Sequence, residues 1–63
     1  MNPEKEKEEI GWLYYELGRH MHLFEKNSAV ALACLDRAGK SLDNNEKIIS
    51  LVAEVYWKNN EKQ

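Results

Sequence analysis

Apolar residues recur at intervals of three or four along most of this 63-residue chain, and this spacing constrains its fold more than any other feature. Residues spaced in this way share one face of an α-helix. No segment alternates between apolar and polar residues with a period of two, so we predict no β-strand. The sequence therefore predicts an all-α protein in which three helices form an antiparallel array.

The chain is short enough to be one domain, residues 1–63, and signals for helix ends divide it into three helices. We predict helices over residues 3–25, 29–38 and 44–58. Asn2 is the expected N-cap of the first helix, and Pro3 suits its first position because a proline lacks the N–H that would stay unpaired there.

The two predicted connections also carry end signals. Ser28 is expected to cap the second helix, and Gly39 is expected to end it in the left-handed conformation. Asp43, with Glu46 three residues later, is expected to form a capping box at the start of the third helix.

The apolar faces of these helices define the predicted core. Its members are Ile10, Leu13, Tyr14, Leu17, Gly18, Met21, Phe24, Ala31, Leu32, Leu35, Ala38, Ile48, Val52, Ala53, Val55 and Tyr56. Gly18 is expected to let a neighbouring helix approach closely. Gly11 is expected to be only a weak point inside the first helix, so that alanine there would be stabilising.

A core of this size is thin, because a chain of about 60 residues buries only about 60% of the surface that it exposes when unfolded. The single cysteine, Cys34, excludes an intrachain disulfide and is expected to be buried as a small apolar residue. The second helix is apolar nearly all round, which suits burial between two layers. We therefore expect a homo-oligomer, either a homodimer or a larger assembly.

An internal repeat relates the first helix to the third. Both carry a large–small pair of residues followed by a large residue, at an offset of 35 residues from Leu17 to Val52. These are Leu17-Gly18 with Met21, and Val52-Ala53 with Tyr56. Between them, Ala31 and Leu35 stand four apart, followed by Ala38.

This order resembles the tetratricopeptide repeat (TPR), which has a period of about 34 residues. The resemblance runs from Tyr14 to about Trp57. It implies one helical hairpin of two antiparallel helices, plus the first helix of a second repeat. The chain departs from the family pattern with Tyr14 in place of the favoured Trp, Met21 in place of Tyr and Leu35 in place of Phe. It also lacks the proline expected before the second repeat.

The polar side of the first helix carries the candidate binding residues. Trp12, Tyr15 and Arg19 belong to the residue types that dominate binding hot spots. The resemblance implies that first helices line a concave groove, which on the third helix would add Lys47, Ser50, Glu54 and Trp57. The predicted partner-binding set is Trp12, Tyr15, Arg19, His22, Leu23 and Trp57. Alternatively, Trp12 and Tyr15 fold under the N-terminal segment or pack against Trp57 as part of the core.

Other classes of site find little support. His20 and His22 are two residues apart, about 200° round a helix, so they cannot share a metal within one chain. We predict no catalytic residues, no metal and no cofactor. The net charge is -2 and the basic residues are scattered, so we expect no nucleic-acid binding. The longest apolar run, Ala29 to Leu35, is too short for a membrane span, and we expect a cytoplasmic protein.

Three functions remain to be separated. The first is a non-enzymatic interaction module, such as a small adaptor, inhibitor or chaperone, that binds a peptide or helix of another protein. The second is a structural homo-oligomer, either a helical bundle or a coiled coil, whose only partner is itself. A helix-turn-helix nucleic-acid binder ranks last, because the third helix balances its lysines with glutamates.

Overall fold

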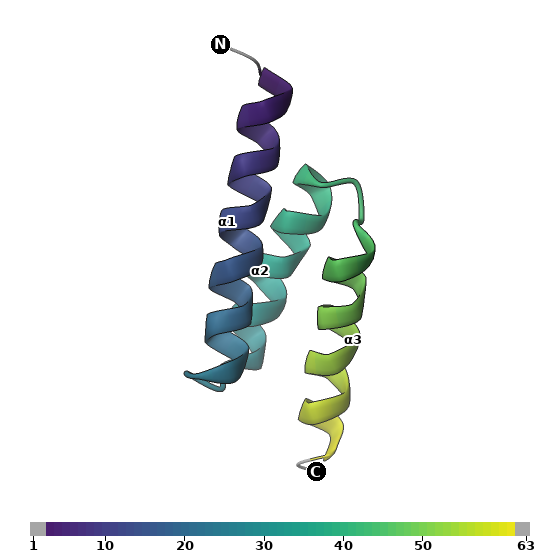
Figure 1. The fold of residues 1–63 in the computed structure, drawn as a ribbon. Coiled ribbons are helices and arrows are strands. Elements are labelled where there is room, and N and C mark those ends of the chain that lie inside the picture. Colours follow the sequence, from purple (N-terminus) through teal and green to yellow (C-terminus); the bar gives the residue numbers. More distant parts are fainter. Residues whose placement is uncertain (1–2, 62–63) are drawn as a thin grey trace.

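The computed structural model describes residues 3–61, which form three helices. They are α1 (Pro3–Leu23), α2 (Ser28–Ser41) and α3 (Glu46–Glu61). Figure 1 shows that each helix runs opposite to the one before it, with α2 reaching both of its neighbours. The array is elongated, with extents of 46 × 19 × 13 Å. The predicted all-α class is confirmed, and residues 3–61 contain no strand.

The turn between α1 and α2 is built differently from the prediction. Helix α1 ends at Leu23, and Lys26 adopts a left-handed φ of 53°. Asn27 is the N-cap of α2, because its side-chain oxygen accepts a hydrogen bond of 3.2 Å from the backbone N–H of Val30. Ser28 is the first helical residue, so its prediction as the cap was wrong. The predicted cap Asn2 lies outside the described residues.

The turn between α2 and α3 also corrects the prediction. Gly39 is helical and α2 continues to Ser41, so Gly39 does not end the helix. Asp43 and Asn44 take the left-handed conformation, with φ of 51° and 56°, which short polar side chains tolerate better than most. Helix α3 is capped by Asn45, whose side-chain oxygen accepts from the backbone N–H of Lys47 at 2.9 Å.

The core lies where α2 meets both neighbours. Its buried apolar residues are Ala31, Cys34, Leu35, Ala38, Ile48, Leu51 and Val55. Leu35 and Val55 are its largest fully buried side chains. Tyr14, Tyr15, Leu32, Leu42 and Val52 are partly buried around it. Helix α1 packs mainly on α2, whereas α1 and α3 touch at only a few positions.

Two glycines of α1 form its contact with α2. A Cβ added at Gly18 would lie 2.9 Å from Cγ of Leu35, so the predicted close contact at Gly18 is confirmed. Gly11 is buried as well, and a Cβ there would lie 2.6 Å from Cγ of Leu42. The prediction that Gly11 is only a weak point of the helix was therefore wrong.

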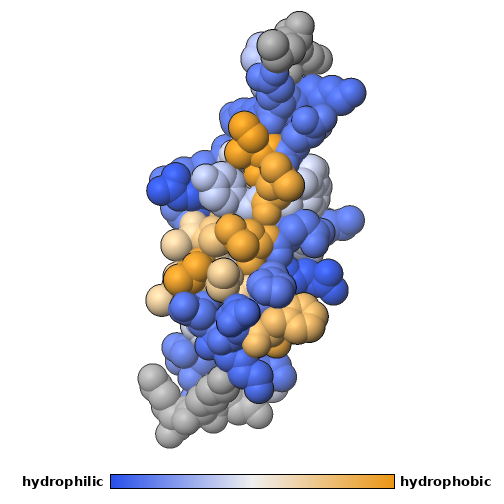
Figure 2. Space-filling model, turned by 90° about the vertical axis from the view of Figure 1, so that its left-hand side faces the viewer, coloured by the Kyte–Doolittle hydropathy of each residue, from blue (hydrophilic) through white to orange (hydrophobic). Residues whose placement is uncertain are grey.

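Several predicted core residues are exposed instead. These are Ile10, Leu13 and Leu17 on α1, Phe24 in the turn that follows α1, and Ala53 and Tyr56 on α3. On α1 the reason is that the glycine side of the helix packs against α2, which leaves the apolar residues at the flank of that contact. Figure 2 shows the result as an apolar band along the molecule, bordered by hydrophilic residues. Met21, predicted to be core, is half-buried.

Candidate partner-binding groove

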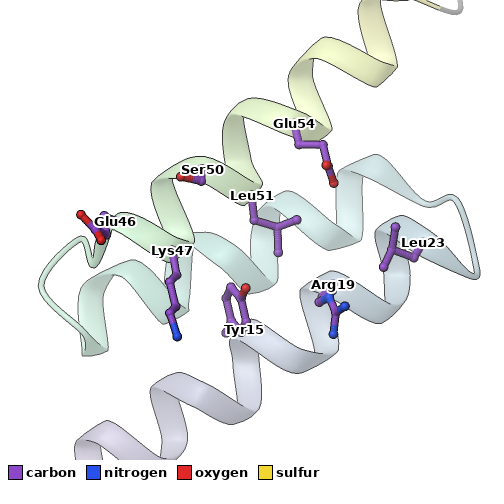
Figure 3. Close-up of a pocket in the computed structure, with 8 residues that line it drawn as sticks. All are labelled: Tyr15, Arg19, Leu23, Glu46, Lys47, Ser50, Leu51 and Glu54. Carbon is purple, nitrogen blue, oxygen red and sulfur yellow. The ribbon is translucent and has the colours of Figure 1, made fainter.

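An open groove of about 820 Å³ runs between α1 and α3. Figure 3 shows Tyr15 of α1 and Lys47 of α3 pointing towards each other across it, with Leu51 pointing between the helices. The complete lining is Tyr15, Arg19, Leu23, Glu46, Lys47, Ser50, Leu51 and Glu54. Of the predicted binding residues, the structure thus brings Tyr15, Arg19 and Leu23 together with Lys47, Ser50 and Glu54.

Trp12 and Tyr15 form an aromatic pair at one side of this groove. Their ring centroids are 5.4 Å apart and their planes meet at 86°, the edge-to-face arrangement that aromatic pairs favour. The ammonium group of Lys47 lies 5.8 Å from the centroid of the Trp12 ring, within the range of a cation–π contact. Both aromatic residues are half-buried, and Tyr15 also packs against the core. Tyr15 therefore belongs both to the fold and to the groove, whereas the predicted binding residue Trp12 lies outside the groove lining and contacts Tyr15.

Arg19 is the exposed cation of the α1 wall. Within residues 3–61, no carboxylate lies in ion-pair range of its guanidinium. A guanidinium offers five N–H donors in a planar fork that matches a carboxylate. The groove therefore presents donors that are available to an acceptor on another molecule.

His22 connects the two walls of the groove. Its Nε2 lies 3.0 Å from Oε2 of Glu54 on α3, and its side chain is only 8% exposed. This arrangement changes the interpretation of His22 as a partner-binding residue, because the imidazole is occupied within the chain. It joins α1 to α3 next to the groove, whose lining includes Glu54 but not His22.

Trp57 lies outside the groove lining. Its side chain is exposed, and the ammonium group of Lys58 lies 5.8 Å from its ring centroid. It does not pack with Trp12 and Tyr15 as the alternative interpretation required, since the ring contact of Trp12 is with Tyr15. Leu23, also predicted for binding, lines the far end of the groove and is exposed.

Two lining residues, Glu46 and Leu51, were missed from the sequence. Leu51 is a buried core residue, and its spacing from Ile48 and Val55 is three and four residues. That helical spacing is the signal that could have identified it. Glu46 was interpreted only as part of a capping box, although the first turn of α3 also forms the end of the groove.

His20 and Cys34 lie outside the groove lining. In the part of the chain that the structure describes, no group of three or more His, Cys, Asp and Glu residues could hold a metal ion. His20 lies 3.7 Å from Glu25, and its ring packs beside Phe24 with a centroid distance of 5.1 Å. Cys34 is a free and buried thiol.

Comparison of the chain with protein-family models, with curated proteins and with solved structures finds no match. No helix among residues 3–61 is long and apolar enough to cross a membrane.

Proposed function

We propose that this chain is a non-enzymatic, TPR-like interaction module that binds a peptide or a helix of another protein in the groove between α1 and α3. The observation that carries the proposal is the composition of this groove. It combines Tyr15, whose ring Trp12 meets edge to face from outside the lining, with Arg19, whose guanidinium has no ion pair within residues 3–61. Aromatic residues and arginine are the types that contribute most to protein-binding hot spots.

The exposed residues of α3 support the repeat interpretation. Gly18 packs closely on Leu35 of α2, whereas its equivalent in the repeat, Ala53, is exposed. Tyr56, the equivalent of Met21, is exposed too. In a continuing array these positions would face a fourth helix, and residues 3–61 contain three helices. Exposure of this face is therefore what a chain of one and a half repeats would have.

The groove also defines the chemistry of its partner. Arg19 and Lys47 line it as cations, and Glu46 and Glu54 line it as carboxylates, of which Glu54 is hydrogen-bonded to His22. A partner segment with a carboxylate beside a large apolar side chain would pair with Arg19 and cover the aromatic edges of Trp12 and Tyr15. Charge complementarity of this kind determines specificity and association rate.

A peptide-display selection with the purified chain as the target tests this proposal. We expect enrichment of short peptides with an acidic residue near an apolar or aromatic one. Their affinity, measured by fluorescence anisotropy, should fall about tenfold or more for Arg19→Ala and for Lys47→Glu.

Lys40→Glu is the matched control for Lys47→Glu, because Lys40 is exposed on α2 and pairs with Asp36 at 3.5 Å, away from the groove. This variant should bind the selected peptides as the wild type does. The proposal is contradicted if no peptide is enriched, or if Lys40→Glu weakens binding as much as Lys47→Glu.

The alternative function, a structural homo-oligomer, is favoured by a different observation, the exposed apolar residues of α1. The two functions are compatible, because Leu17 and Arg19 are two residues apart and therefore about 200° apart round the helix.

A further inference from the structure

The apolar band on the outside of the α1–α2 pair, which we call the outer stripe, is not covered by another helix within residues 3–61. It consists of Ile10, Leu13 and Leu17 on α1, Phe24 in the turn that follows α1, and Val30 on α2. Arg37 of α2 lies over the ring of Tyr14, 5.9 Å from its centroid, so this face of α2 borders the stripe. Val30 lies on the same face of α2, because it is two helical turns from Arg37. A hollow of about 240 Å³ lies between Ile10, Leu13, Tyr14 and Leu17.

The outer stripe exposes an apolar area similar to that of the largest patches on monomeric proteins. Leu13 is 69% exposed and Phe24 73%, and the other three side chains are between 39% and 49% exposed. Together they present roughly 500 Å² of apolar surface, comparable to the largest patches on monomers, which are often functional. With its polar border the stripe approaches the roughly 800 Å² per partner that a stable interface buries.

The two long edges of the outer stripe differ in charge. Glu9 lies four residues before Leu13, and Glu16 lies three residues after it. Both glutamates are exposed and lie on the edge of the stripe away from α2. The edge on α2 carries the exposed cation Arg37. A surface with one acidic and one basic edge is self-complementary if a second copy brings its basic edge over the acidic one.

Because the array is elongated, the outer stripes of two copies can overlap fully in only two twofold arrangements. With the axis across the helices, each acidic edge faces the acidic edge of the partner. With the axis parallel to the helices, the acidic edge of each copy faces the basic edge of the other. Residues at the same position along the helix axis then lie opposite each other. Glu16 lies two residues, about 3 Å, beyond Tyr14 along α1, so in this second arrangement it reaches Arg37 of the other copy.

We infer that the outer stripe binds a second copy of this chain, in a twofold dimer whose axis runs parallel to the helices. In this dimer, α1 of each copy lies over α2 of the other, Leu13, Leu17 and Phe24 are covered, and Glu16 pairs with Arg37. The dimer supplies the second layer that the thin core of a single copy lacks. The inference does not rest on peptide binding.

The arrangement also determines where the two grooves lie. Since the groove and the outer stripe are on nearly opposite sides of α1, the two grooves of the dimer face away from each other and stay open. A partner that carries two copies of a binding segment would then be held by both grooves, and its avidity would exceed its affinity for one.

Sedimentation velocity of the purified chain over a range of concentrations tests the dimer. We expect the wild type to sediment as a dimer, and Leu13→Glu to weaken association at least about thirtyfold, because it places a charge in the centre of the interface. Leu13 is mostly exposed in a single copy, so the variant should keep its helical circular dichroism.

Ile49→Glu is the matched control, because Ile49 is a 55% exposed apolar residue on α3, outside the stripe. This variant should remain a dimer. A wild type that is monomeric at every concentration overturns the inference. So does dissociation by Ile49→Glu without dissociation by Leu13→Glu, which would place the interface on α3.

A charge exchange tests the orientation without altering the apolar residues. Glu16→Arg and Arg37→Glu should each weaken association about tenfold at low salt, and the double variant should restore it. If the double variant associates no better than the single ones, the arrangement with the axis parallel to the helices is wrong. Both residues are exposed, and circular dichroism of each variant checks that it remains folded.

Discussion

His22 and Glu54 are 32 residues apart in the sequence, yet Nε2 of the histidine lies 3.0 Å from Oε2 of the glutamate. The pair joins α1 to α3, which otherwise meet at only a few positions. The histidine side chain is nearly buried while the glutamate is 49% exposed, so the interaction is partly shielded from water. The hydrogen bond between His22 and Glu54 holds α1 and α3 together at this end of the groove.

Replacing His22 by alanine should therefore loosen α3. We expect a loss of about 1 kcal/mol in the free energy of unfolding, the size of one net hydrogen bond. His20→Ala is the control, because His20 is exposed and 3.7 Å from Glu25. Thermal denaturation of both variants measures the difference, and equal melting temperatures would contradict the bridging role of His22.

The glycines of α1 and α2 should respond oppositely to alanine. Gly11→Ala and Gly18→Ala each place a methyl group under 3.0 Å from a leucine Cγ, so each should lower the free energy of unfolding by about 1–3 kcal/mol. At Gly39 the nearest atom is the Asn44 side-chain oxygen at 3.2 Å. Gly39→Ala should be neutral or stabilise by up to about 1 kcal/mol through helix propensity. Urea denaturation ranks the three, and a stabilised Gly11→Ala would show that α1 and α2 are further apart.

Two adjacent isoleucines of α3 provide a test of the core. Ile48 is 3% exposed and Ile49 is 55% exposed. Ile48→Ala should cost about 2–5 kcal/mol, because it removes buried methyl groups and leaves a cavity. Ile49→Ala should change the free energy of unfolding by no more than about 0.5 kcal/mol. If denaturation shows the reverse order, α3 is rotated from the position described.

The helix caps make a fourth test. Asn27→Ala and Asn45→Ala each remove a side-chain acceptor from a backbone N–H, and each should cost about 1 kcal/mol. Ser28→Ala is the control for Asn27, since Ser28 is already inside the helix. A larger loss for Ser28→Ala than for Asn27→Ala, measured by thermal denaturation, would contradict the observed cap.

The fold class and the three helices follow from the sequence because helical spacing and turn residues are local signals. The side of α1 that faces α2 follows only in part. The close approach at Gly18 was predicted, but the one at Gly11 was not, and apolar spacing indicated Ile10, Leu13 and Leu17, which are exposed. The spacing of large side chains cannot identify a contact surface that is formed by glycines, because glycine has no side chain.

The groove was easier to predict than the core. Tyr15 and Arg19 were assigned from their residue types on the polar side of a helix, and Lys47, Ser50 and Glu54 from the offset of the repeat. The roles of His22 and Trp57 depended on which long-range contacts form. A helical pattern predicts which face of its own helix a residue lies on. It does not predict which side chain of another helix lies opposite, which for His22 is Glu54.

The packing order along the chain has a consequence for motion. Contacts join α1 to α2 and α2 to α3, so α3 can leave the array while the α1–α2 hairpin stays intact. Amide hydrogens of α3 should then exchange with solvent before those in the middle of α2. The groove exists only while α3 is docked, so a ligand held there would slow exchange in α3 far more than in α2.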